Sequence, residues 1–247
     1  MRPFTITSFL VFVLAATAIG QTGPAFEVAS VKHAAGGGPP GDIPRNMDSS
    51  PGHFAMRNVP LRYAVEWAWD LKDYEISGPD WIRGDERYDI IAKASGAATD
   101  EQMKPMLQAL LLERFQMKIR RETKDLPVYV LAPGKGPAKV TTPAPDAQTR
   151  ISGTAAGAHF EKQPMSRLTF LLTRRLDRPV LDKTGLTGMY DYTLDLSGLP
   201  TPEHPMGEEG TSIFSAIQKD LGLKLEARKE PISILVIDQV SKIPTAN

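Results

Sequence analysis

Aspartates and histidines are the residues of this chain that could carry out acid–base chemistry. Two carboxylates can hydrolyse a bond when one donates a proton and the other acts as base or nucleophile. Asp89 and Asp191 stand out because they occupy equivalent places in two similar halves of the chain. Aspartates near glycine are also typical of exposed turns, and we favour that structural role. The candidates are Asp80, Asp85, Asp89, Asp182, Asp191 and Asp195.

The four histidines are candidates for general bases or metal ligands. They show no H-E-x-x-H spacing and no close pairing, and the chain has no cysteine to complete a zinc site. His53 and His159 are equivalent by the repeat, so they are candidates for a site at the interface between the halves. We favour a role in flanking strands, and we expect neither a metal nor a cofactor. The histidines are His33, His53, His159 and His204.

The run Asp182-Lys183-Thr184-Gly185 suggests two enzyme classes. Asp-Lys-Thr-Gly opens the phosphorylation motif of cation-pumping ATPases, but those enzymes need cytoplasmic ATP, membrane helices and a far longer chain. Lys-Thr-Gly also occurs in serine β-lactamases, which need Ser-x-x-Lys and Ser-Asp-Asn elements that this sequence lacks. We therefore interpret the run as a turn before a strand at Tyr190.

Aromatic residues are concentrated in the first half, which holds Trp67, Trp69 and Trp81 together with Tyr63 and Tyr74. On a helix, Trp67 lies about 160° from Trp69, so the two cannot both face the core. Trp81 falls in a predicted turn, and exposed tryptophan is suited to stacking on sugars, peptides or a partner protein. We take Trp67, Tyr74 and Trp81 as ligand-binding candidates, with core packing as the alternative.

The helices and strands that would position these residues are predicted by a sequence pattern that occurs twice. Residues 106–133 predict a helix followed by two strands, and residues 213–237 repeat the pattern with the apolar positions in phase. Thr99 and Gln102 predict a capping box, although Pro105 suggests that the regular helix begins only there. The sequence predicts an α+β fold of two tandem strand-helix-strand-helix-strand-strand units, with helices packed on one face of each sheet.

The predicted boundaries follow composition. We expect a signal peptide at 1–20, a first repeat with an N-terminal strand and a Gly/Pro loop at 21–133, a linker at 134–158 and a second repeat at 159–247. The copies could pack side by side around a groove, or share one continuous sheet. The sequence leaves both arrangements open.

Net charge and targeting signals limit the classes of binding partner and the cellular location that we expect. The 29 basic and 29 acidic residues cancel, which argues against nucleic acid and anionic membranes as partners. Arg2, the apolar run at 4–16 and the small residues near Gly20 predict a cleaved signal peptide, and no later stretch is long enough to span a membrane. Because no cysteine follows the signal, the expected location is the periplasm or the exterior rather than a lipid anchor.

Most of the chain after residue 20 resembles a family of uncharacterised exported proteins abundant in soil bacteria. Some members of that family look like extracytoplasmic tails of membrane metallopeptidases of the antibiotic-sensor antirepressor type. The resemblance implies sensing or binding. The segments that carry it are FEVASVK, FAMRNVPLRYAVEWAW, ISGPDW, YDIIAKA, MLQALLLERFQMKIRRE, LPVYVLA, RPVLDKTGLTGMYDYTLDL and GLKLEARKEPISILVIDQV.

We therefore expect a non-catalytic binding or sensory module for a peptide, a glycan or a partner protein. One alternative is a small extracytoplasmic hydrolase that uses carboxylate or histidine chemistry at the repeat interface. Another is a structural accessory domain of an envelope complex, joined through its strand edges.

Overall fold

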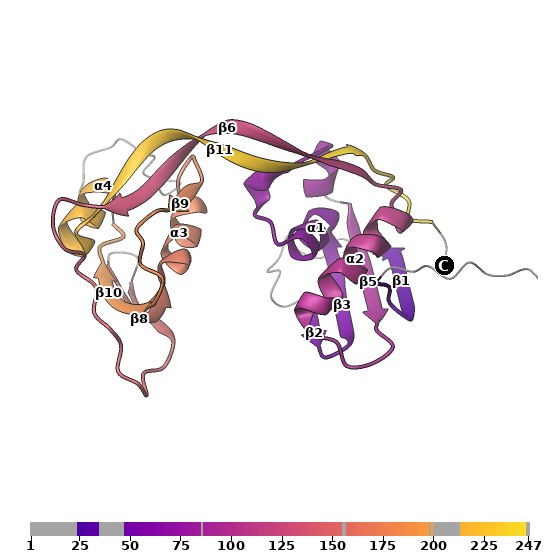
Figure 1. The fold of residues 1–247 in the computed structure, drawn as a ribbon, viewed down its shortest axis with the longest axis horizontal. Coiled ribbons are helices and arrows are strands. Elements are labelled where there is room, and N and C mark those ends of the chain that lie inside the picture. The colour runs from indigo at the N-terminus through magenta and orange to yellow at the C-terminus, as the bar shows by residue number, and fades with distance from the viewer. Residues whose placement is uncertain are drawn as a thin grey trace, which may run out of the picture. The chain divides into compact units, whose positions relative to one another are not determined.

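The computed structural model describes residues 24–34, 47–84, 86–154, 157–197, 199 and 213–245 (Figure 1). The predicted signal peptide at 1–20 lies outside these residues. The described residues form helices and three β-sheets, which confirms the predicted α+β class.

The chain forms two compact units, each built from separate stretches of sequence. The first unit comprises the described residues of Met1–Asp73, Gly78–Lys118 and Ile237–Asn247. The second comprises those of Tyr74–Ser77 and Ile119–Val236. The units therefore differ from the predicted division at 133 and 159, because strands from both halves of the sequence join in one sheet of the second unit.

The first unit is an antiparallel sheet with strand order β1-β5-β3-β2 and two helices on one face (Figure 1). The apolar sides of the helices and the sheet form its core, which includes Phe54, Met56, Leu61, Val65, Ile90, Met103, Leu107 and Leu111. Its strands are β1 (Val28–His33), β2 (Met47–Ser50), β3 (His53–Pro60) and β5 (Arg87–Lys93). Its helices are α1 (Leu61–Trp69), α2 (Asp100–Arg114) and the short 3-10 turn η3 (Asp80–Arg83); a second such turn, η2 (Asp73–Glu75), crosses the boundary between the units.

Helix α2 begins earlier than Pro105 suggested. The Thr99 hydroxyl accepts from the Gln102 N–H at 3.4 Å, and the Gln102 Oε1 accepts from the Thr99 N–H at 2.9 Å. This is the predicted capping box, and it starts the helix at Asp100. Pro105 lies inside this helix, where it cannot donate to the Glu101 carbonyl and its ring crowds that carbonyl, but the helix continues through it to Arg114.

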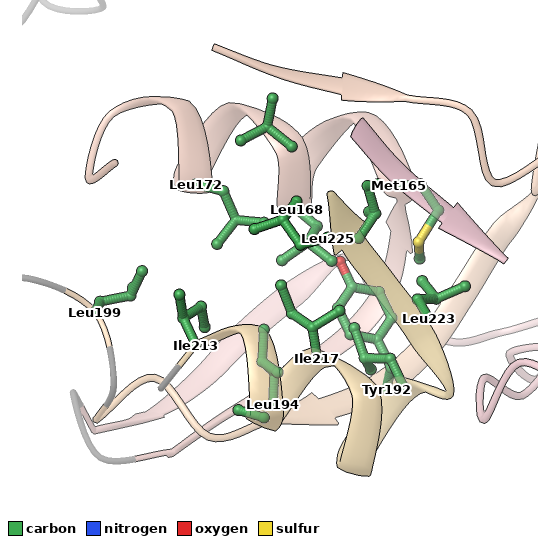
Figure 2. Close-up of a cluster of buried hydrophobic side chains, with 14 of the residues drawn as sticks. Met165, Leu168, Leu172, Tyr192, Leu194, Leu199, Ile213, Ile217, Leu223 and Leu225 are labelled. Carbon is green, nitrogen blue, oxygen red and sulfur yellow. The ribbon is translucent and has the colours of Figure 1, made fainter. Parts of the chain in front are cut away.

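The second unit contains a sheet with order β10-β8-β7 and a sheet with order β4-β11-β6-β9. Its first sheet comprises β7 (Arg150–Thr154), β8 (Gly157–Pro164) and β10 (Met189–Leu194). Helix α3 (Met165–Thr173) and helix α4 (Ile213–Ala216), which continues into the π-helical turn η4 (Ile217–Leu221), bury apolar side chains against β10 and β11, as Figure 2 shows. Strand β7 lies inside the predicted linker at 134–158, so the end of that stretch is part of a sheet rather than a connection.

Two long strands replace the predicted pairs of short ones. Strand β6 (Lys118–Pro133) and strand β11 (Leu223–Gln239) are hydrogen-bonded neighbours (Figure 1). The sequence predicted two strands in each stretch, and each forms one continuous strand whose charged middle part has exposed side chains. Short strands β9 (Val180–Asp182) and β4 (Ile76–Ser77) pair in parallel with β6 and β11, respectively.

Both units contain the same irregularity next to their first helix. The pairing of β3 with β5 shifts between Met56 and Val59, and the pairing of β8 with β10 shifts between Tyr190 and Tyr192. At the shift, Asn58 (φ 54°) and Lys162 (φ 49°) adopt a left-handed conformation that is costly for non-glycine residues. The two bulges agree with the tandem pattern of the sequence, while the copying of one ancestral unit stays a prediction.

Candidate functional site

The three aromatic candidates are divided between the units. Trp67 on α1 and Trp81 in η3 belong to the first unit, whereas Tyr74 belongs to the second. Trp67 is half-buried and packs on Phe54 with ring centroids 4.6 Å apart. Trp81 has the Lys242 ammonium 5.7 Å above its ring. Tyr74 packs against an apolar cluster of β11, so of the three only Trp67 lines the pocket described next.

A pocket of about 240 Å³ opens between β2, β3 and α1 in the first unit. The edge strand β2 contributes Met47, the buried strand β3 contributes Met56, and the remaining walls come from α1 and the residues just after it. Apolar and aromatic side chains make up nearly all of the surface. The lining residues are Met47, Met56, Tyr63, Glu66, Trp67 and Leu71.

Glu66 is the carboxylate of this pocket. Its Oε1 accepts from Arg62 Nη1 at 2.8 Å, one helical turn away. The same Nη1 lies 2.8 Å from the Asp73 carboxylate, which also accepts from Arg83 Nε at 3.1 Å. Arg62 therefore divides its attraction between two carboxylates. The Glu66 Oε2 has no hydrogen-bond partner among the described residues, and the side chain keeps 20% of its surface accessible.

Burial raises the pKa of Glu66 to about 7, because the apolar surroundings destabilise the ionised form more than Arg62 stabilises it. The negative charge of Asp73 adds to the rise, and Arg83 opposes it. A carboxyl group whose pKa is shifted this far in a concave site is a candidate for binding or chemistry.

Asp89 and Asp191 perform the same structural task in their two units. The Asp89 Oδ1 accepts from the Asn58 N–H at 2.8 Å, and the Asp191 Oδ1 accepts from the Lys162 N–H at 2.7 Å. Each carboxylate thus satisfies a main-chain donor that the bulge takes out of the ladder. The equivalence predicted for the two aspartates holds locally, but their carboxylates lie in different units and stabilise backbone.

His53 and His159 do not occupy equivalent positions. In the register set by the prolines before α1 and α3, His159 opposes Thr193 on β10, and the corresponding residue of β3 is Ala55, which opposes Ile91. Matching the two His-Phe pairs shifts β8 by two residues from the alignment that the prolines and the bulges share, so Phe54 and Phe160 are not equivalent either. His159 Nδ1 lies 2.9 Å from the Thr193 hydroxyl. Across the described residues, no three His, Asp or Glu side chains gather as a metal site would require.

The Asp182-Lys183-Thr184-Gly185 run forms the predicted turn. The Asp182 Oδ1 accepts from the Thr184 N–H at 2.9 Å and from the Thr184 hydroxyl at 2.7 Å. Gly185 has φ 75°, a conformation that favours glycine. Lys183 pairs with Glu230 at 2.6 Å. The polar groups of the run are thus used to hold the turn.

A second hollow, of about 490 Å³, lies on the second unit and is lined by Lys139, Gly157, Thr193, Asp195 and Asp220. It is larger than the Glu66 pocket, but its acidic groups are already engaged. Asp195 Oδ1 accepts from the Ser197 hydroxyl at 2.6 Å, which lowers the pKa of Asp195, and Asp220 Oδ2 accepts from the Asp195 N–H at 3.0 Å. We therefore regard the smaller, apolar pocket as the better ligand site.

Sequence reasoning missed Arg62, Glu66 and the two methionines. The i,i+4 spacing of Arg62 and Glu66 was visible, and Trp67 follows Glu66 directly. The contribution of Met47 was not visible, because it depends on the pairing of β2 with β3.

A family model described as "Protein of unknown function (DUF3738)" matches residues 62–240. The chain belongs to this family. The DUF3738 match begins at Arg62 and includes the pocket residues of α1 and Leu71. It confirms the predicted membership of a domain family of unknown function. No curated protein and no solved structure matches the chain. Over the ranges that the structure describes, we find no helix with the length and apolar character of a membrane span.

Proposed function

We propose that this DUF3738 protein is a non-catalytic binding module that holds a small apolar group of a peptide or partner protein in the Glu66 pocket. The observation that carries the proposal is a mostly apolar pocket that brings Trp67 and two methionines around one half-buried carboxylate. Methionine and tryptophan are adaptable, high-area contacts in binding sites.

The size and lining of the pocket favour a side chain over a larger ligand. Its volume of about 240 Å³ is below the roughly 300–1,000 Å³ of pockets that enclose drug-sized ligands. Sugars need several polar partners for their hydroxyls, and the lining supplies few. A peptide side chain or terminus suits this pocket better than a glycan.

The proposal places the module in the periplasm or outside the cell, where a sensory role would follow from capture of a peptide. Its support is the signal-like sequence at 1–20 and the resemblance to exported proteins.

The two alternative functions receive less support. The predicted hydrolase would use a pair of carboxylates, whereas Asp89 and Asp191 accept main-chain hydrogen bonds and Glu66 is the single carboxylate that lines its pocket. Pairing through strand edges would use outer strands such as β1 and β7, which carry the exposed charged side chains Lys32 and Arg150. Charged side chains along a strand edge oppose edge-to-edge association.

Titration calorimetry on the protein lacking residues 1–20 tests the proposal. The probes are the N-acetyl amides of leucine, phenylalanine and methionine, with cellobiose as the glycan probe. We expect the amides to bind and Trp67→Leu to weaken them at least tenfold, while Trp81→Leu, a half-buried tryptophan outside the pocket, leaves them unchanged. Binding of cellobiose alone, or equal loss in both variants, would reject the proposal.

A further inference from the structure

We infer that the Glu66 pocket selects a group with a positive charge on an apolar body, a primary or quaternary ammonium, and that Glu66 Oε2 is its counter-ion. The inference rests on the proposed function and names the chemistry of its ligand.

The first step is the incomplete pairing of the carboxylate. Arg62 bonds only the Oε1 of Glu66 and shares the same nitrogen with Asp73. The charge of Asp73 is also met by Arg83, at the more exposed end of the network. Oε2 accepts no hydrogen bond from the described residues, and Glu66 lines the pocket. A half-buried carboxylate oxygen without a donor is best satisfied by a group that carries positive charge, to which a primary ammonium adds an N–H hydrogen bond.

The second step concerns the side chains that line the pocket together with Glu66. Tyr63 and Trp67 line the same pocket, and aromatic faces attract cations through their quadrupoles. The Arg62 guanidinium lies 4.3 Å from the Tyr63 ring centroid, which shows this attraction operating next to the site. Met47, Met56 and Leu71 offer no charge, so they suit the apolar body of the ligand.

The third step is the exclusion of other ligand classes. A carboxylate or phosphate would approach Glu66 against like charge in an apolar setting, at high cost. A neutral apolar group would fill the volume but would leave Oε2 without a partner. A neutral donor such as an alcohol or an amide can also bond Oε2 from the apolar pocket, but only a cationic group adds the attraction between opposite charges.

The charged and titratable groups that act on Glu66 are Arg62, Asp73 and Arg83. Because the pKa of Glu66 is about 7, a bound cation must displace its proton near neutral pH. From pH 6 to pH 8 the ionised fraction rises by about tenfold, so the affinity for a cation should rise by about the same factor. The affinity of a neutral analogue should not rise.

The experiment compares four probes that share one apolar body: 2-phenylethylamine, its N-trimethyl derivative, 2-phenylethanol and 3-phenylpropionate. Calorimetry with the protein lacking residues 1–20 should rank both ammonium probes at least tenfold above the alcohol at pH 8, with the acid weakest. Glu66→Gln should reduce the amines to the level of the alcohol and leave the alcohol unchanged. Asp70→Asn is the matched control, because Asp70 is an 88% exposed carboxylate just after α1 and asparagine tolerates its left-handed backbone.

The outcomes separate this inference from the proposed function. Equal binding of amine and alcohol, both lost in Trp67→Leu, would overturn the charge selection and keep the binding module. Absence of binding by every probe would overturn both. If Glu66→Gln does not fold, the wild-type pH series decides: an amine affinity that stays flat or falls from pH 6 to pH 8 contradicts the inference.

Discussion

The two units share one local structure, a strand bulge followed by a helix, but they carry different side chains on that helix. In each, a strand bulges at a left-handed residue, an aspartate from the next sheet strand accepts the freed N–H, and a proline precedes a helix of nine residues. Counted from Pro60 and Pro164, Glu66 of α1 corresponds to Phe170 of α3. The backbone structure recurs in both units, but the residue types at equivalent helix positions differ.

The difference is largest where the helices face solvent. Phe170 is 51% exposed, and the guanidinium carbons of Arg167 and Arg174 lie 5.5 and 5.8 Å from its ring centroid. The corresponding positions of α1 carry Tyr63 and Asp70. A frame held by main-chain hydrogen bonds leaves these positions free to vary, so a ligand site in one unit does not imply one in the other.

The largest expected effect tests whether the two cores correspond. Met56 and Phe160 occupy the same register position before the bulge, and both are fully buried. We expect Phe160→Ala to cost about 3–5 kcal/mol and Met56→Ala about 2–5 kcal/mol of unfolding free energy, through the cavity each leaves. Urea denaturation measures both, with the partly exposed Ile91→Ala as the mild control. A negligible effect in one unit would break the correspondence.

The next effect belongs to the first unit alone. The pKa of Glu66 is raised from its usual 4.5 to about 7 in the folded protein, equivalent to about 3 kcal/mol at ~1.4 kcal/mol per pKa unit. The stability associated with protonated Glu66 is complete below pH 4.5 and is lost as the pH rises through about 7. Glu66→Gln should therefore gain stability relative to wild type across this window, whereas Phe170→Gln should not. Parallel pH profiles of wild type and Glu66→Gln would refute the prediction.

The shared bulge should respond equally in both units. Asp89→Ala and Asp191→Ala each leave a main-chain N–H without its acceptor, at an expected cost of about 1–3 kcal/mol. The asparagine variants should cost less, because the amide oxygen still accepts. Chemical denaturation of the four variants checks this, and a cost confined to one aspartate would show that the bulges are held differently.

The smallest effect is expected at the surface of α3. Phe170→Ser should change the unfolding free energy by no more than about 0.5 kcal/mol, because the exposed ring contributes little burial. A thermal melt is sufficient to detect a larger change. A loss above that value would mean that the ring packs against the second unit and is not part of its surface.

The parts of the fold that were predictable depend on neighbours in sequence. The capping box of Thr99 and Gln102 and the turn at Asp182 follow from short-range spacing, whereas the bulge role of Asp89 depends on a residue 31 positions away. The missed parts depend on pairing between distant segments. No local pattern indicated that β6 would run unbroken through its charged stretch, because β11 supplies the hydrogen bonds that allow it.

The sequence indicated only part of the candidate site, for the same reason. Trp67 was identified from its place on the helix opposite Trp69, while Tyr74 and Trp81 were grouped with it only by closeness in sequence. The histidine pairing failed because the two His-Phe pairs recur two residues out of step with the prolines and bulges that align β3 with β8.

By itself the sequence determined the α+β class, the capping box of α2 and the turn at Asp182, since hydrophobic period and capping act over a few residues. Tertiary structure alone decided that Met47 of an edge strand meets Glu66 of a helix, and that burial carries the pKa of this carboxyl to about 7. Desolvation depends on everything packed around a group, and here that environment arises only when the β2–β3 hairpin and α1 come together in the folded unit.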